Sequence, residues 1–131
     1  MKCLFDNNMP IKLAKALNLL EGEDGIVVKH LMEQFPSDTS DITWVEELKK
    51  DGGWFVITKD NQIRKKPHER KAWQESNIPI VFLPKSWVKL SLWEMAWRLI
   101  KYWPELTENI VSNKKTESFE LAIQGKITMV R

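Results

Sequence analysis

Short apolar runs alternate with amphipathic segments along the chain, and this alternation is typical of a parallel β-sheet covered by helices. The runs contain apolar or β-branched residues, and turn-forming residues separate them from segments whose apolar residues recur at helical spacing. We therefore expect an α/β fold with a mainly parallel sheet. The predicted strands are residues 2–5, 26–30, 54–58 and 78–84, followed by a terminal strand or hairpin around Gly125 within residues 118–130.

Four segments are predicted to be helical. The first begins near Pro10, a good residue for a first helical turn, and ends before Gly22. The second covers residues 42–50, and the third follows a basic connection and ends near Asn77. The fourth, at about residues 87–103, holds four of the seven tryptophans. Residues 104–117 are polar, and we assign no element to them.

The tryptophan-rich segment has two apolar stripes, although one stripe is enough to cover a sheet. The second stripe predicts that the outer face of this helix is buried as well, either under the C-terminal tail or against a second chain. One stripe contains Leu90, Trp93, Trp97 and Ile100, and the other contains Leu92, Met95, Ala96, Leu99 and Trp103.

Length and composition limit the protein class. The 131 residues suffice for one domain, in which residues 87–131 would be accessory or dimerisation elements. With 43% apolar and 29% charged residues, the chain is not compositionally disordered. No apolar run is long enough for a membrane span and no signal-peptide pattern is present, so we expect a cytoplasmic protein. The net charge of +2 says little about nucleic-acid binding, and Cys3 reads as a buried, inert thiol.

Three aspartates are predicted to meet at the carboxyl edge of the sheet, where ligands bind in folds of this kind. Asp6 follows the first strand, Asp60 follows the third, and Asp41 opens the helix after the second. At about 100° per residue, Asp41 lies roughly 40° from Val45 and 20° from Leu48 around the helix axis. Asp41 is therefore expected on the buried stripe of its helix.

Each aspartate taken alone could be a turn or helix-cap residue. Together they would repel one another unless a cation neutralised them, and Mg²⁺ or Mn²⁺ prefers such oxygen ligands. A phosphatase with an aspartyl-phosphate intermediate would need an acid at position 8, where the chain has Asn8, and a phosphorylated receiver domain would need paired acids after the first strand. A metal-dependent nuclease needs neither of these features.

Basic residues crowd the segment after Asp60 and could hold a phosphate backbone, although such runs are also common on plain solvated faces. They are Arg64, Lys65, Lys66, His68, Arg70 and Lys71.

Three stretches together resemble the PIN-like domain, in the branch related to VapC-type toxins of toxin–antitoxin systems. They are CLFDNNMPIKLAKAL from residue 3, FPSDTSDITWVEEL from residue 35 and GGWFVITKDNQIRKKPHERKAW from residue 52. The most specific part of the resemblance, which covers about residues 1–85, is the ordered set of three aspartates with a strand followed by T-x-D.

The resemblance implies a three-layer α/β/α sandwich and a Mg²⁺- or Mn²⁺-dependent endoribonuclease that cuts single-stranded RNA. Its acidic motifs carry over to Asp6, Asp41 and Asp60 as metal ligands and catalytic residues, with Arg64 as a substrate contact. PIN domains usually bring a fourth acid from a helix, and no residue here clearly matches it. Relatives are often dimers inhibited by an antitoxin protein. A catalytically silent PIN-like module that binds RNA or protein is the alternative.

Overall fold

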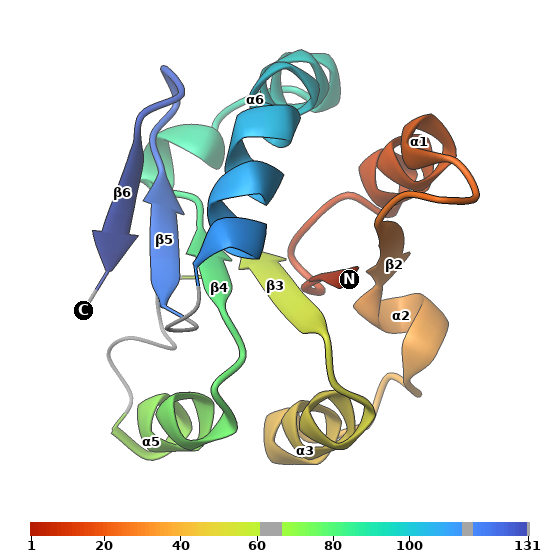
Figure 1. Ribbon diagram of the computed structural model, residues 1–131, viewed down its shortest axis with the longest axis vertical. Coiled ribbons are helices and arrows are strands. Elements are labelled where there is room, and N and C mark those ends of the chain that lie inside the picture. The colour runs from red at the N-terminus through yellow and green to blue at the C-terminus, as the bar shows by residue number, and fades with distance from the viewer. Residues whose placement is uncertain (61–66, 114–116, 131) are drawn as a thin grey trace.

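The computed structural model describes residues 1–60, 67–113 and 117–130, and its centre is a sheet of six strands in the order β2-β1-β3-β4-β5-β6 (Figure 1). Every neighbouring pair is parallel except β5 with β6, which is antiparallel. The prediction of a mainly parallel α/β fold is therefore confirmed. The strands are β1 (Lys2–Phe5), β2 (Val27–His30), β3 (Trp54–Thr58), β4 (Ile80–Phe82), β5 (Ser118–Leu121) and β6 (Ile127–Val130).

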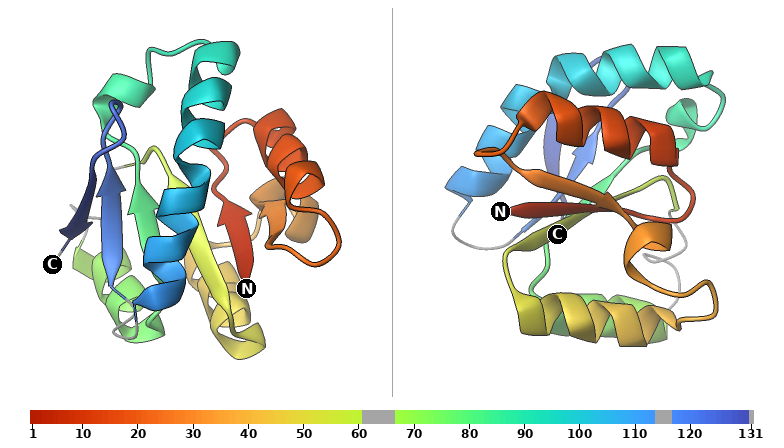
Figure 2. Two further views of the ribbon diagram at one scale, coloured as in Figure 1. Left: turned by 45° about the horizontal axis from the view of Figure 1, so that its top comes forward. Right: turned by 90° about the vertical axis from the view of Figure 1, so that its right-hand side faces the viewer.

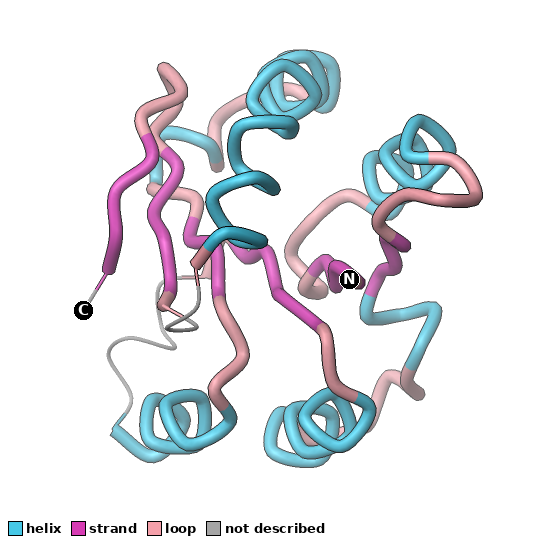
Figure 3. Tube along the Cα trace, in the orientation of Figure 1, coloured by secondary structure: helices cyan, strands magenta, loops and turns pink. Residues whose placement is uncertain are grey.

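Helices cover both faces of the sheet and complete three layers (Figure 2). One face carries α1 (Ile11–Glu21) and α6 (Leu92–Ser112), and the other carries α3 (Asp41–Asp51) and α5 (Pro67–Ser76). A short helix, α2 (Leu31–Gln34), follows β2 directly, and a single 3₁₀ turn (Lys85–Trp87) precedes α6 (Figure 3). None of the helices in the described part of the chain is both long and apolar enough to cross a membrane.

The strands alternate between two cores because successive side chains point to opposite faces of a sheet. Cys3 and Phe5 of β1 pack in the core under α1 and α6, whereas Leu4 packs with Trp44 and Trp73 under α3 and α5. Since both faces are covered, the strands of the sheet centre are continuous apolar runs. The Cys3 thiol is fully buried and burial raises its pKa, so it is a core side chain and not a ready nucleophile.

Helix α6 starts later and ends later than the sequence pattern suggested. It begins at Leu92, where the Ser91 hydroxyl accepts a hydrogen bond from the Glu94 amide, and it runs through Pro104 to Ser112. The proline costs about 3 kcal/mol inside a helix. Leu106 and Ile110 beyond it are buried, and each contributes about 1.5–3 kcal/mol, which offsets that cost. The assignment of no element to residues 104–112 was therefore wrong.

The C-terminal tail does not cover the outer stripe of α6, which contains Trp93, Trp97 and Ile100. The expectation that the tail buries this stripe is therefore wrong. Strands β5 and β6 form a hairpin that extends the sheet past β4 (Figure 1). On α6, Met95, Leu99 and Trp103 face the core, while the Trp93 side chain is 82% exposed and that of Trp97 is 49% exposed. One stripe of the helix therefore builds the core and the other faces outward.

The turn of the hairpin docks on α6 through Tyr102 and Gly125. The Tyr102 hydroxyl donates to the Ile123 carbonyl at 3.0 Å, and Gly125 has a φ of +100°. A Cβ at position 125 would lie 2.6 Å from the Tyr102 ring, which no side chain tolerates without displacement. Glycine is therefore required here both by backbone conformation and by contact.

We predict that Gly125→Ala lowers the free energy of unfolding more than Gly53→Ala does. Gly53 has a similar positive φ of +77° but open space around its Cβ position, so it controls for backbone strain alone. The overpacking against Tyr102 should add about 1–3 kcal/mol. Equilibrium urea unfolding of both variants measures the difference, and equal losses would contradict the docking of the turn on α6.

Candidate active site

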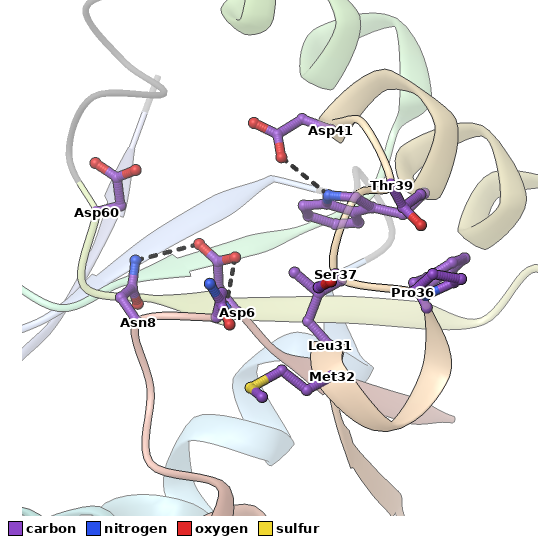
Figure 4. A pocket seen from close by; sticks show the side chains of 12 residues that line it. Asp6, Asn8, Leu31, Met32, Pro36, Ser37, Thr39, Asp41 and Asp60 are labelled. Atoms are coloured by element: carbon purple, nitrogen blue, oxygen red, sulfur yellow. Dashed lines mark hydrogen bonds between the residues drawn. The ribbon is translucent and has the colours of Figure 1, made fainter.

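A pocket of about 540 Å³ lies at the carboxyl edge of the sheet, between the segments that follow β1, β2 and β3 (Figure 4). Its polar side is lined by Asp6, Asn7, Asn8, Asp41 and Asp60. The pocket therefore brings the three predicted aspartates to one cavity, from three separate parts of the chain.

Asp6 is held at the end of β1 by its neighbour β3. Its amide donates to the Ile57 carbonyl at 3.0 Å, which continues the pairing of the two strands by one residue. Its carboxylate accepts from the Thr58 hydroxyl at 2.8 Å, from the Asn7 amide at 2.8 Å and, more weakly, from the Asn8 carboxamide at 3.3 Å. The direction of the carboxylate is thus set by donors on two strand ends.

Thr58 and Asn8 organise this edge of the sheet, a role that the sequence pattern did not predict for either residue. The buried Thr58 hydroxyl donates to Asp6 and accepts from the Asn8 carboxamide at 3.2 Å and from the Asp60 amide at 2.9 Å. The Asn8 carboxamide oxygen also accepts from the Lys59 amide at 3.0 Å. One feature of the sequence could have indicated the role of Thr58. It is a hydroxyl residue at the end of the otherwise apolar strand β3, and an aspartate follows the neighbouring strand β1 at the same edge.

The electrostatic environment of Asp6 disfavours its charged form. Burial is the largest cause and raises the pKa of Asp6 above its ordinary value. The hydrogen bonds from Thr58 and Asn7 lower this pKa, and the charges of Asp41 and Asp60 raise it again. The three aspartates therefore interact electrostatically, and the hydrogen bonds from Thr58 and Asn7 only partly offset the burial of Asp6.

Asp41 is the first residue of α3, and the Ser40 hydroxyl caps the helix by accepting from the Thr43 amide at 3.3 Å. The helix-cap explanation for Asp41 is therefore wrong. Its carboxylate accepts from the Trp44 indole N–H at 3.0 Å and lines the pocket from the start of α3 (Figure 4). The expectation that Asp41 is buried is also wrong, because its side chain is exposed at the start of α3.

The predicted substrate contacts Arg64, Lys65 and Lys66 lie outside the described residues. The side chains of His68 and Arg70 do as well. Lys71 is in α5 and pairs with Glu75 one helical turn later at 4.0 Å, an exposed pair that contributes little. Lys59 is half-buried beside the pocket, and burial lowers its pKa.

The donor chemistry of the pocket suits a hard divalent cation, because carboxylate and carboxamide oxygens are the ligands that Mg²⁺ and Mn²⁺ prefer. Across residues 1–60, 67–113 and 117–130, no three His, Cys, Asp or Glu side chains converge closely enough to form a ready-made metal cage. A Mg²⁺ ion usually keeps several waters and uses only one or two carboxylates together with substrate phosphate. The residues present therefore fit such an ion, with Asp6 as the best-positioned ligand.

Comparison with known proteins identifies the family. A family model described as a PIN like domain matches residues 1–85, which include β1 to β4 and all three aspartates. The chain belongs to the PIN-like domain family. No curated protein and no solved structure matches the chain. In this PIN-like domain the matched part ends before α6 and the β5–β6 hairpin.

We predict that Thr58→Val raises the pKa of Asp6 further in the metal-free PIN-like domain, whereas Thr58→Ser leaves it nearly unchanged. A hydrogen bond to the charged form lowers the pKa of a carboxyl group, so losing the hydroxyl donor must raise it. Titration of the aspartate carboxyl ¹³C signals in EDTA measures the effect. An unchanged pKa of Asp6 in Thr58→Val would show that the hydroxyl does not hold the carboxylate.

Proposed function

We propose that this PIN-like domain is a Mg²⁺- or Mn²⁺-dependent endoribonuclease, acting in the cytoplasm as the VapC-like toxin of a toxin–antitoxin system. The observation that supports the proposal is that Asp6, Asp41 and Asp60 line one pocket at the carboxyl edge of the sheet in a chain of this family. Nuclease activity is common among PIN-like domains, and a phosphodiester is the substrate that this acidic pocket would act on with a cation.

The geometry supports a role for each residue. We assign Asp6, Asp41 and Asp60 to the cation, one or two of them as direct ligands and the rest acting through its waters, since no three acids converge among the described residues. When bound, the cation supplies charge stabilisation on the phosphate and lowers the pKa of water. Thr58 and Asn7 hold the Asp6 carboxylate in one orientation, and the Trp44 indole does the same for Asp41. Such fixed orientation matters, because catalytic groups must be in place before the transition state forms.

Phosphate binding needs positive charge as well. We assign this role to Arg64, Lys65 and Lys66, which follow Asp60 in the sequence. This assignment stays a prediction. The support for this assignment is sequence order: Asp60 lines the acidic end of the pocket, and the basic residues follow it closely along the chain.

A catalytically silent PIN-like module is the second candidate. It is favoured by the lack of a three-ligand cage among the described residues and by the missing match to a fourth family acid. Such a module would bind RNA or protein through the same pocket without hydrolysis.

We predict that Asp6→Asn reduces Mn²⁺-dependent cleavage of unstructured RNA at least about 10- to 100-fold, the loss typical of changes around metal ligands. Asp24→Asn, an exposed aspartate in the turn before β2, is the matched control and should keep full activity. Cleavage is measured on end-labelled RNA with Mn²⁺, with Mg²⁺ and with EDTA.

Cleavage that survives both EDTA and the Asp6 substitution would overturn the metal-site proposal. Binding of RNA without any metal-dependent cleavage would favour the silent module.

The outer stripe of α6 supports a protein partner, and we propose a second copy of this chain as that partner. Trp93, Trp97 and Ile100 are exposed on one face of the helix, although large apolar side chains seldom gather on a free surface. A symmetric dimer would bury the same stripe twice. The antitoxin, whose binding we also propose, is the competing occupant.

We predict that the chain is a dimer by light scattering and that Trp93→Glu makes it a monomer. Leu19→Glu is the matched control, since the Leu19 side chain on α1 is 83% exposed and lies outside the stripe. A wild-type monomer would assign the stripe to the antitoxin, and a dimer that survives Trp93→Glu would place the interface elsewhere.

A further inference from the structure

The candidate pocket has a second wall that metal binding does not use. Leu31 and Met32 of α2 and Pro36 just after it lie on the side of the pocket away from Asp60 (Figure 4), and Phe35 also lines the pocket. Met32 is 64% exposed, so its thioether chain stands open at the pocket. One cavity thus joins an acidic end to an apolar end.

This wall is fixed in place by packing. Leu31 and Phe35 are half-buried and pack against the core under α3 and α5, which leaves their outer surfaces facing the cavity. An apolar surface that is already ordered loses little entropy when a ligand covers it, so it binds better than a mobile one.

Hydrogen bonds from the end of β2 hold α2 as well. The His30 ring is buried, accepts from the Met32 amide at 3.1 Å and contacts the Met9 carbonyl at 2.7 Å. The Glu33 carboxylate accepts from the His30 amide at 3.0 Å, which completes a capping box. The segment that carries the wall is therefore tied both to the β2 end and to the loop after Asp6.

We propose that this apolar wall is a stacking subsite for one unpaired nucleobase, whose own phosphate lies at the acidic end of the pocket. The inference rests on the proposed function in taking a nucleotide as the ligand. A nucleotide joins a flat base, whose two faces can stack on apolar side chains, to a phosphate through a single sugar, and this matches the two ends of the cavity. The pocket volume of about 540 Å³ lies within the range of about 300–1,000 Å³ that holds small ligands.

The wall favours stacking over recognition of a particular base. Every base has a flat π face, so stacking tolerates any sequence. The polar groups beside the wall are the hydroxyls of Ser37 and Thr39, each of which can donate or accept. Such groups accommodate the edges of different bases. The subsite therefore selects a splayed, unpaired base and leaves its identity open.

The test uses mononucleotides, which contain no phosphodiester to cleave, so base binding is separated from nuclease activity. The probes are adenosine with a phosphate on its 3′ or its 5′ oxygen, compared with ribose 5-phosphate, all with Mg²⁺. The readout is the methyl NMR signal of each of the five methionines. A base stacked on Met32 shifts its methyl signal upfield through the ring current, while Met129, exposed on β6, should not move.

We expect at least one adenosine monophosphate to bind about 5- to 150-fold more tightly than ribose 5-phosphate, the range given by base stacking. Met32→Ala should weaken nucleotide binding about 2- to 10-fold, as expected for a sulfur–ring contact, and Met129→Ala is the matched control with no effect. Phe35→Leu keeps an apolar side chain and should also weaken binding of the nucleotide but not of ribose 5-phosphate.

Equal affinities for the nucleotides and ribose 5-phosphate, or no nucleotide binding, would overturn the base subsite while leaving the nuclease proposal untouched. Base-dependent binding at Met32 in a protein that cleaves no RNA would overturn the nuclease proposal and keep the subsite. A shift of the Met32 methyl by an apolar peptide, with none by nucleotides, would assign the wall to a protein partner instead.

Discussion

The parallel pairing of β1 with β3 is the constraint on which the rest of the site depends. The register places Phe5 opposite Ile57, and the next residues, Asp6 and Thr58, meet where the ladder ends. Both strands are buried on two faces, so neither can shift by one residue without moving its core side chains to the wrong side. The hydrogen bond from the Thr58 hydroxyl to Asp6 is therefore a product of core packing.

The pocket combines two surfaces that are unfavourable when left alone. Its acidic end gathers carboxylates whose mutual repulsion contributes to the raised pKa of Asp6. Its other end exposes apolar side chains, and the Met32 side chain is 64% exposed. A nucleotide bound together with a cation would relieve both: the cation would neutralise the carboxylates, and the face of the base would cover the apolar side chains. The same cavity thus accounts for the proposed chemistry and for the proposed base subsite.

The region that the family model matches contains all residues that line the pocket, but it does not contain the whole core. Residues after the match, including Trp87, Leu99, Leu106 and Leu121, belong to the same buried cluster as Cys3 and Phe5 of β1. Trp103 also donates from its indole N–H to Glu21 at the end of α1. Helix α6 therefore stabilises the strand that presents Asp6, while its outer stripe remains available for a partner.

The sequence by itself determined the strands, the order of the three aspartates along the chain and the turn at Gly125, because these follow from local apolar runs and from where each run stops. The tertiary structure alone decided features that arise between distant segments. The Thr58–Asp6 bond joins residues 52 positions apart, and α2 depends on the buried ring of His30. The exposure of Asp41 and the continuation of α6 through Pro104 likewise reflect packing, which overrides local periodicity and propensity.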